Sequence, residues 1–146
     1  FPSMNIGDIV NRISGWSEQS PVLMPPVSRF AGNTIGYIVP YWYIGALTAA
    51  KQPTTAVEIG TYLGASALTM ALNSPEDCRI ITVDLPEDSE EDTGTLSQGD
   101  KNLVANAKNR VGQAFLGHPL SKKITQVRTN SSTLDLQKYV TRPVDF

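Results

Sequence analysis

Residues 57–68 read VEIGTYLGASAL, and this short stretch decides the fold. An apolar run with β-branched residues ends at Gly60, a second glycine stands at position 64, and strong helix formers follow at once. This order is typical of a buried strand, a tight turn and a helix. Gly60 permits a positive φ, and Gly64 removes a side chain that would keep a ligand or a neighbouring strand at a distance. The stretch therefore predicts a βα unit with a ligand-binding turn.

The residues on both sides repeat this alternation of strand and helix. The expected strands cover residues 55–59, 79–85 and 123–128, and the expected helices between them cover residues 64–73 and 100–111. The first two strands are apolar on nearly every position, which indicates a parallel sheet that is buried on both faces. The sequence predicts an α/β fold of the Rossmann-like, doubly wound type, with a mainly parallel sheet and flanking helices. Val144 is expected to open a fourth strand, and the sheet to be incomplete after that point.

The chain before the first strand is expected to be less regular. Residues 1–36 are interpreted as an N-terminal helix, over residues 3–16, followed by a loop that contains Pro and Gly. Residues 37–146 are interpreted as the ligand-binding domain. Within it, Pro40 is predicted to lie in the first turn of a helix over residues 41–51, where its missing N–H has no cost.

Composition excludes several classes of function. Twelve basic and fourteen acidic residues give a net charge of -2 without a dense basic cluster, so nucleic acid is not expected as a partner. The longest apolar stretch, residues 37–50, is too short for a membrane span. Cys78 is the only cysteine and His118 the only histidine, so we expect no metal site. The single cysteine also favours a reducing compartment, with the cytoplasm as the expected location.

The two ends of the chain suggest a fragment of a longer protein. The sequence begins at Phe1 and stops at Phe146, just inside the expected fourth strand. A short fourth strand would leave much of one sheet edge unpaired, and unpaired edges favour association between chains. A homo-oligomer is therefore a possible state.

The turn after the first strand has the features of a nucleoside site. Backbone N–H groups at a helix start attract an anion, and the Ser66 hydroxyl can bond a carboxylate there. Asp84 follows Gly60 by 24 residues, at the end of the second strand, where a carboxylate can accept both ribose hydroxyls. Tyr62 stands where a dinucleotide turn has its middle glycine, and its bulk disfavours a pyrophosphate without excluding it.

Glu58 narrows the choice of ligand. It can cap the N–H groups of the turn, or it can receive the ammonium of an amino acid whose carboxylate meets the helix start. The second interpretation joins an amino acid to adenosine, as in S-adenosylmethionine. An NAD(P)-dependent oxidoreductase and a non-catalytic nucleotide-binding or scaffold domain stay open as alternatives.

The motifs themselves resemble a known family. VEIGTYLGASAL is similar to the first motif of class I S-adenosylmethionine-dependent methyltransferases, in the small-molecule O-methyltransferase-like branch, and residues 83–85 resemble its acidic second motif. Residues 124–136 resemble the third strand and following turn, with Asn130 and Ser131 where the family contacts adenine, and residues 143–146 resemble the start of the fourth strand. The resemblance implies a small-molecule methyl acceptor, with methyl transfer at oxygen, and leaves the catalytic residues unknown. The residues assigned to the cofactor are Glu58, Gly60, Thr61, Tyr62, Gly64, Ser66, Asp84, Leu85, Asn130 and Ser131.

Overall fold

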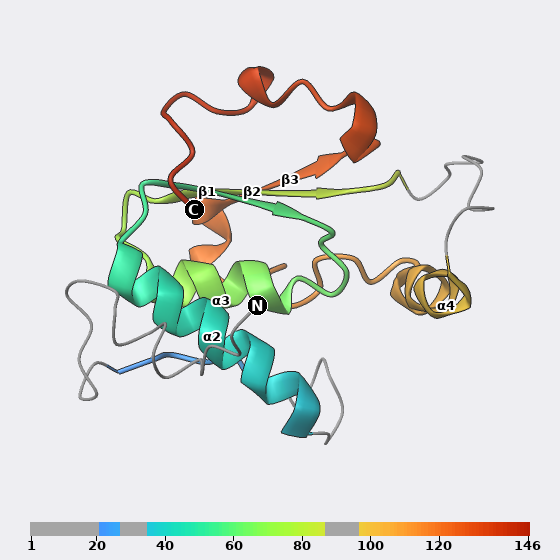
Figure 1. Ribbon diagram of the computed structural model, residues 1–146, viewed down its shortest axis with the longest axis horizontal. Helices are drawn as coiled ribbons and strands as arrows, with labels where there is room; N and C mark the ends of the chain where they lie inside the picture. The colour runs from blue at the N-terminus through green and yellow to red at the C-terminus, as the bar shows by residue number, and fades with distance from the viewer. Residues whose placement is uncertain (1–20, 27–34, 87–96) are drawn as a thin grey trace, which may run out of the picture.

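Three parallel strands form one open sheet at the centre of the computed structural model, which describes residues 21–26, 35–86 and 97–146 (Figure 1). The strands are β1 (Thr55–Ile59), β2 (Arg79–Asp84) and β3 (Ile124–Arg128), in the spatial order β1-β2-β3. Both pairs are parallel, and their register places Glu58 beside Thr82 and Thr82 beside Gln126. The carboxyl ends of all three strands therefore meet at one edge. The Rossmann-like α/β fold expected from the sequence is confirmed.

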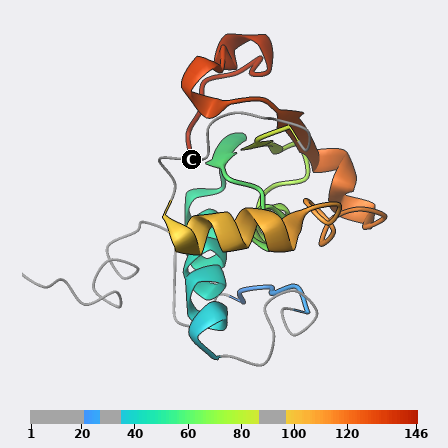
Figure 2. The same cartoon turned by 90° about the vertical axis from the view of Figure 1, so that its right-hand side faces the viewer.

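Helices flank this sheet. They are α2 (Ile35–Lys51), α3 (Ala65–Asn73) and α4 (Gln98–Ala107), with the short 3-10 helices η3 (Pro119–Lys123), η4 (Ser131–Thr133) and η5 (Leu136–Lys138). α2 and α3 lie on one side of the sheet, and the segment that carries η4 and η5 lies on the other (Figure 1). Seen from the carboxyl ends of the strands, α4 runs across the front of the molecule (Figure 2). The expected helix over residues 3–16 lies outside the described residues.

The core has two layers because the strand side chains alternate between the two faces of the sheet. Toward α3, the buried cluster comprises Ala56, Ala65, Ala67, Leu68, Met70, Ala71, Cys78, Ile80, Ala114 and Phe115. The smaller cluster on the opposite face comprises Ile81, Val83 and Val127, and Leu134 and Val140 pack against it. This burial fixes the sheet register, since a slip of one residue would turn each apolar side chain to the wrong face.

Pro40 does not lie in a first helical turn, and the prediction for it was wrong. α2 begins at Ile35, so Pro40 is the sixth residue of the helix. Proline lacks the N–H that would bond the carbonyl of residue 36, but this removes only one bond near the helix start. The remaining residues up to Lys51 keep their helical bonds, and Pro53 lies just beyond the helix end as expected.

The segment at Val144 does not form the expected fourth strand, although it lies beside β1. The Asp145 amide donates to the Thr55 carbonyl (3.1 Å), and the Val57 amide donates to the Phe146 carbonyl (3.0 Å). The Asp145 carboxylate also accepts the amides of Thr55 (2.9 Å) and Thr54 (3.0 Å). Two ladder bonds are too few for a strand, but they cover part of the β1 edge. Association through that edge stays a prediction.

Lys123 closes the carboxyl end of α3. Its side chain is buried, and its ammonium donates to the carbonyls of Ala71 (2.6 Å) and Ser74 (3.0 Å). Burial lowers the pKa of the ammonium, while the two carbonyls accept two of its three N–H donors. A cation at this end also complements the helix dipole.

Candidate functional site

The two glycines of the β1–α3 turn have different roles. Both have positive φ, 93° at Gly60 and 81° at Gly64, which favours glycine. A Cβ on Gly60 would meet nothing within 4 Å, so the backbone is open to a ligand there. A Cβ on Gly64 would come within 2.6 Å of the Phe115 ring. Gly60 therefore provides access, whereas Gly64 permits close packing of the chain.

Asp84 holds the turn from the neighbouring strand. Its Oδ2 accepts the amides of Thr61 (3.0 Å) and Tyr62 (2.9 Å), and its Oδ1 accepts the amide of Leu85 (2.9 Å). Tyr62 has φ 47°, an uncommon value for a residue with a side chain, and the bond from its amide stabilises this conformation. Each carboxylate oxygen accepts about two bonds, so Oδ1 keeps capacity for one further donor. The sequence alone did not reveal this capping role of Asp84.

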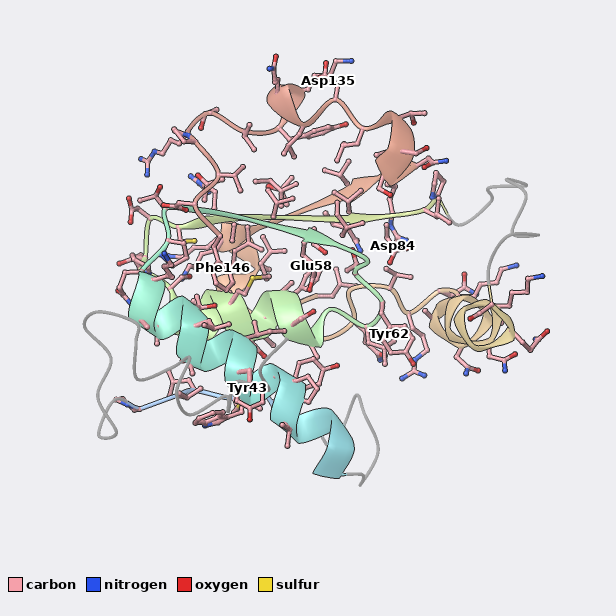
Figure 3. All side chains as sticks on the ribbon, viewed as in Figure 1. Tyr43, Glu58, Tyr62, Asp84, Asp135 and Phe146 are labelled. Atoms are coloured by element: carbon pink, nitrogen blue, oxygen red, sulfur yellow. The ribbon has the colours of Figure 1, made fainter. Side chains whose placement is uncertain are left out.

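Glu58 lies between the sheet and α3, on the side where Phe146 also lies (Figure 3). Its Oε1 accepts a bond from the Ser66 hydroxyl, and its Oε2 accepts one from the Thr82 hydroxyl (2.7 Å). Burial raises the pKa of Glu58, hydrogen bonds from Ser66 and Thr82 act in the opposite direction, and the charge of Asp84 raises it further. A partly buried carboxylate held by neutral hydroxyls is a good receptor for a ligand cation.

The start of α3 supplies the complementary polarity. The amides of Ala65, Ser66 and Ala67 belong to the first turn, where no helical carbonyl is available to them. Gly64 precedes them as the N-cap and has no side chain that could bond them. These donors and the positive end of the helix dipole favour an anion near Glu58, which the Ser66 hydroxyl of the same turn contacts.

The third strand brings Asn130 and Ser131 to the same edge of the sheet. The Thr129 amide donates to the Asp84 carbonyl (2.8 Å), which ties the end of β3 to the end of β2. Asn130 caps η4, where its side-chain oxygen accepts the amide of Ser132 (2.8 Å), and Ser131 is exposed. The structure therefore brings the residues assigned to the cofactor to the carboxyl ends of three adjacent strands.

A cavity of about 240 Å³ opens beside Glu58. Its other lining residues are Ile44 of α2, Val57 of β1, Met70 of α3 and Phe146. The walls are apolar apart from the Glu58 carboxylate, so the cavity suits a group with an apolar body and a cationic end. The sequence contains no local signal for this cavity, because its residues come from four separate segments.

Two further observations concern metal ions and membranes. Among the described residues, no group of His, Cys, Asp and Glu side chains is arranged to hold a metal ion. No helix within the described ranges has the length and apolar character that a membrane crossing requires.

Known families give an independent comparison. Residues 43–111 match the O-methyltransferase family model. This segment contains β1, the glycine turn, α3 and β2, and therefore both of the stronger motifs, at residues 57–68 and 83–85. The resemblance to class I S-adenosylmethionine-dependent methyltransferases is confirmed over the matched segment. Residues 124–136 and 143–146 lie beyond it, so the motif assignments there stay predictions. No curated protein gives a significant match to the chain.

The family match supports an O-methyltransferase-like function that depends on S-adenosylmethionine. The geometry of the site fits that cofactor on three counts. A partly buried carboxylate is available for an ammonium and an uncapped helix start for a carboxylate, and the open backbone of Gly60 lies between them in the sequence.

Proposed function

We propose that this chain binds S-adenosylmethionine at the carboxyl ends of β1, β2 and β3, and that the protein methylates an oxygen of a small-molecule acceptor. The observation that supports this most is the placement of Glu58 and Asp84 at adjacent strand ends, where both contact the segment that leads into an uncapped helix start. This arrangement offers a partner to each charged group of an amino acid joined to a nucleoside.

Each part of the ligand has a proposed partner. Glu58 receives the ammonium, and the first-turn amides of α3 receive the carboxylate. The free capacity of Asp84 Oδ1 receives a ribose hydroxyl, while Oδ2 stays bonded to the turn. Asn130 and Ser131 lie at the end of β3, where they face the adenine.

The chain's own residues bind and orient the reactants. S-adenosylmethionine, when bound, supplies a methyl group attached to a sulfonium, whose sulfur is a good leaving group. Alignment of the acceptor, the methyl group and the sulfur therefore accounts for much of the rate. The apolar walls of the open cavity, including Ile44 and Met70, offer the ligand apolar contact beside Glu58. Because ligand ammonium favours ionised Glu58, affinity should rise with pH as Glu58 titrates above its usual pKa of 4.5.

Calorimetric titration with three ligands tests the proposal. S-adenosylhomocysteine carries the amino acid and the nucleoside, methylthioadenosine carries only the nucleoside, and NAD is the ligand of the competing oxidoreductase function. We expect the order S-adenosylhomocysteine, methylthioadenosine, NAD, from tightest to weakest. Tighter binding of NAD would refute the proposal in favour of an oxidoreductase.

The variant Glu58→Gln separates the two ends of the ligand. It should weaken S-adenosylhomocysteine by roughly 10- to 100-fold, the effect of losing a charged hydrogen-bonded partner, and leave methylthioadenosine unchanged. Glu76→Gln is the matched control, because Glu76 is exposed and its carboxylate pairs with Lys122 at the surface. Transfer of labelled methyl groups to a pool of small hydroxylated acceptors distinguishes an enzyme from a scaffold domain, which would bind the cofactor and transfer none.

A further inference from the structure

Two buried hydroxyls form a directed chain that ends at Glu58. Thr82 Oγ1 donates to Glu58 Oε2 (2.7 Å) and lies 2.8 Å from Thr61 Oγ1. A hydroxyl has a single proton, and that of Thr82 points to the carboxylate. Thr61 must therefore be the donor in the second contact. The chain runs from Thr61 through Thr82 to Glu58.

Thr61 connects this chain to the second carboxylate. Its hydroxyl is directed to Thr82, while its amide donates to Asp84 Oδ2 (3.0 Å). Thr61 and Thr82 have exposed fractions of 1% and 0%. Valine would fill the same buried volume without polar atoms, so packing alone does not require the hydroxyls.

We propose that Thr82, supported by Thr61, is a positioning residue that fixes the orientation of the Glu58 carboxylate toward the ammonium of the bound ligand. This inference rests on the proposed function, adds Thr82, which the family resemblance did not assign, and gives Thr61 a supporting role. Thr82 acts on Oε2, so Glu58 is held on one side by the sheet and on the other by Ser66 of α3.

The surroundings of Glu58 make its ionisation depend on these bonds. Burial raises its pKa most, the Ser66 and Thr82 hydroxyls lower it, and Asp84 raises it. The cavity side chains that face it from α2, α3 and the C-terminal segment are Ile44, Met70 and Phe146, none of which titrates. Within the described residues, Asp84 is thus the charged group identified as acting on Glu58, and the hydroxyls are the groups that favour its ionised form.

The first test follows the Glu58 carboxyl in the ligand-free protein by carbon-13 NMR titration. Thr82→Val should raise its pKa, because one stabilising donor is lost, and Thr82→Ser should restore it. Thr69→Val is the matched control. Thr69 is equally buried, but its hydroxyl donates to the Ala65 carbonyl within α3, so its loss should leave the titration unchanged.

The second test measures ligand affinity as a function of pH. Thr82→Val should weaken S-adenosylhomocysteine about tenfold near neutral pH, the effect of one lost bond to an ionised carboxylate, and should move the rise in affinity to higher pH. Methylthioadenosine, which has no ammonium, should bind the variant as tightly as the unchanged protein. Thr82→Ser should behave like the unchanged protein with both ligands.

The outcomes separate this inference from the proposed function. Equal pKa and affinity in the Thr82→Val and Thr69→Val variants would overturn it. If the unchanged protein does not bind S-adenosylhomocysteine, the proposed function fails and the ligand role of Thr82 fails with it, while the NMR titration decides separately whether Thr82 controls Glu58. If Thr82→Val does not fold, Thr61→Val breaks only the outer bond and should cause a smaller shift in the same direction. An unshifted Glu58 titration in that variant would overturn the proposed hydrogen-bond chain from Thr61 through Thr82.

Discussion

Replacing Asp84 by alanine should destabilise the protein strongly even without a ligand. The carboxylate accepts three main-chain amides at 2.9–3.0 Å, two of them from the turn that enters α3. Each loss costs about 1 kcal/mol, because the site is half-buried and water satisfies the orphaned amides in part. The sum is about 3 kcal/mol, a large share of a typical free energy of unfolding of about 5–15 kcal/mol.

Asp84→Asn refines the prediction. Its single amide oxygen can still accept the amides of Thr61 and Tyr62, but the –NH₂ group then faces the Leu85 amide, donor against donor. The expected loss is about 1–2 kcal/mol, clearly less than for alanine. The two variants therefore measure the turn bonds and the Leu85 bond separately.

Urea unfolding monitored by circular dichroism provides the measurement. The control is Asp135→Ala, which removes an exposed carboxylate whose ion pair with Lys138 spans 3.7 Å, and it should cost less than about 0.5 kcal/mol. If Asp84→Ala costs no more than this control, Asp84 does not hold the turn. Its carboxylate would then be available in full to a ligand.

Two other substitutions test the packing of the turn and the anchoring of the C-terminal segment. In urea unfolding, Gly64→Ala should lower the free energy of unfolding by about 2–4 kcal/mol, because its Cβ would lie 2.6 Å from the Phe115 ring at a positive φ. Gly117 is the control, because it has a similar φ but open space around it, and Gly117→Ala should cost about 1 kcal/mol. Bonds from the amide and hydroxyl of Thr54 help to lower the pKa of Asp145. The ionised carboxylate therefore stabilises the folded protein fully above its usual pKa of 3.8, and this stabilisation is lost as pH falls through the lowered pKa. The melting temperatures of the unchanged protein and Asp145→Asn should therefore differ near neutral pH and converge in acid; a constant difference would contradict this account.

The sequence was sufficient to predict the elements that are set by local pattern. β1 matches the expected range, 55–59, and the turn at Gly60 leads into α3 as expected. These segments combine strong apolar periodicity with glycine or proline at their ends, so local preference and burial agree. Pro40 was misplaced because helix preference over residues 35–39 is weak, and the helix is stabilised by packing against α3 rather than by its own residues.

The bonds of the site could be predicted only in part. Glu58, Asp84 and the helix start were placed correctly at adjacent strand ends, because parallel strands bring their carboxyl ends to one edge. The register of β2 beside β1 decides which amides and hydroxyls bond to each carboxylate. No local sequence pattern predicts that register. Thr82 was missed for this reason, because in the sequence it is one more β-branched residue in a buried strand.

The two ends of α3 are stabilised in different ways. At its carboxyl end, the buried ammonium of Lys123 donates to the carbonyls of Ala71 and Ser74, so side-chain donors of the protein itself hold that end. At its amino end, Gly64 provides no cap, and the first-turn amides stay available to a bound anion. The stabilising contacts and the proposed anion site are thus at opposite ends of a single nine-residue helix. Substitutions near Lys123 should therefore change how firmly the helix is held and leave the proposed anion site at the opposite end unchanged.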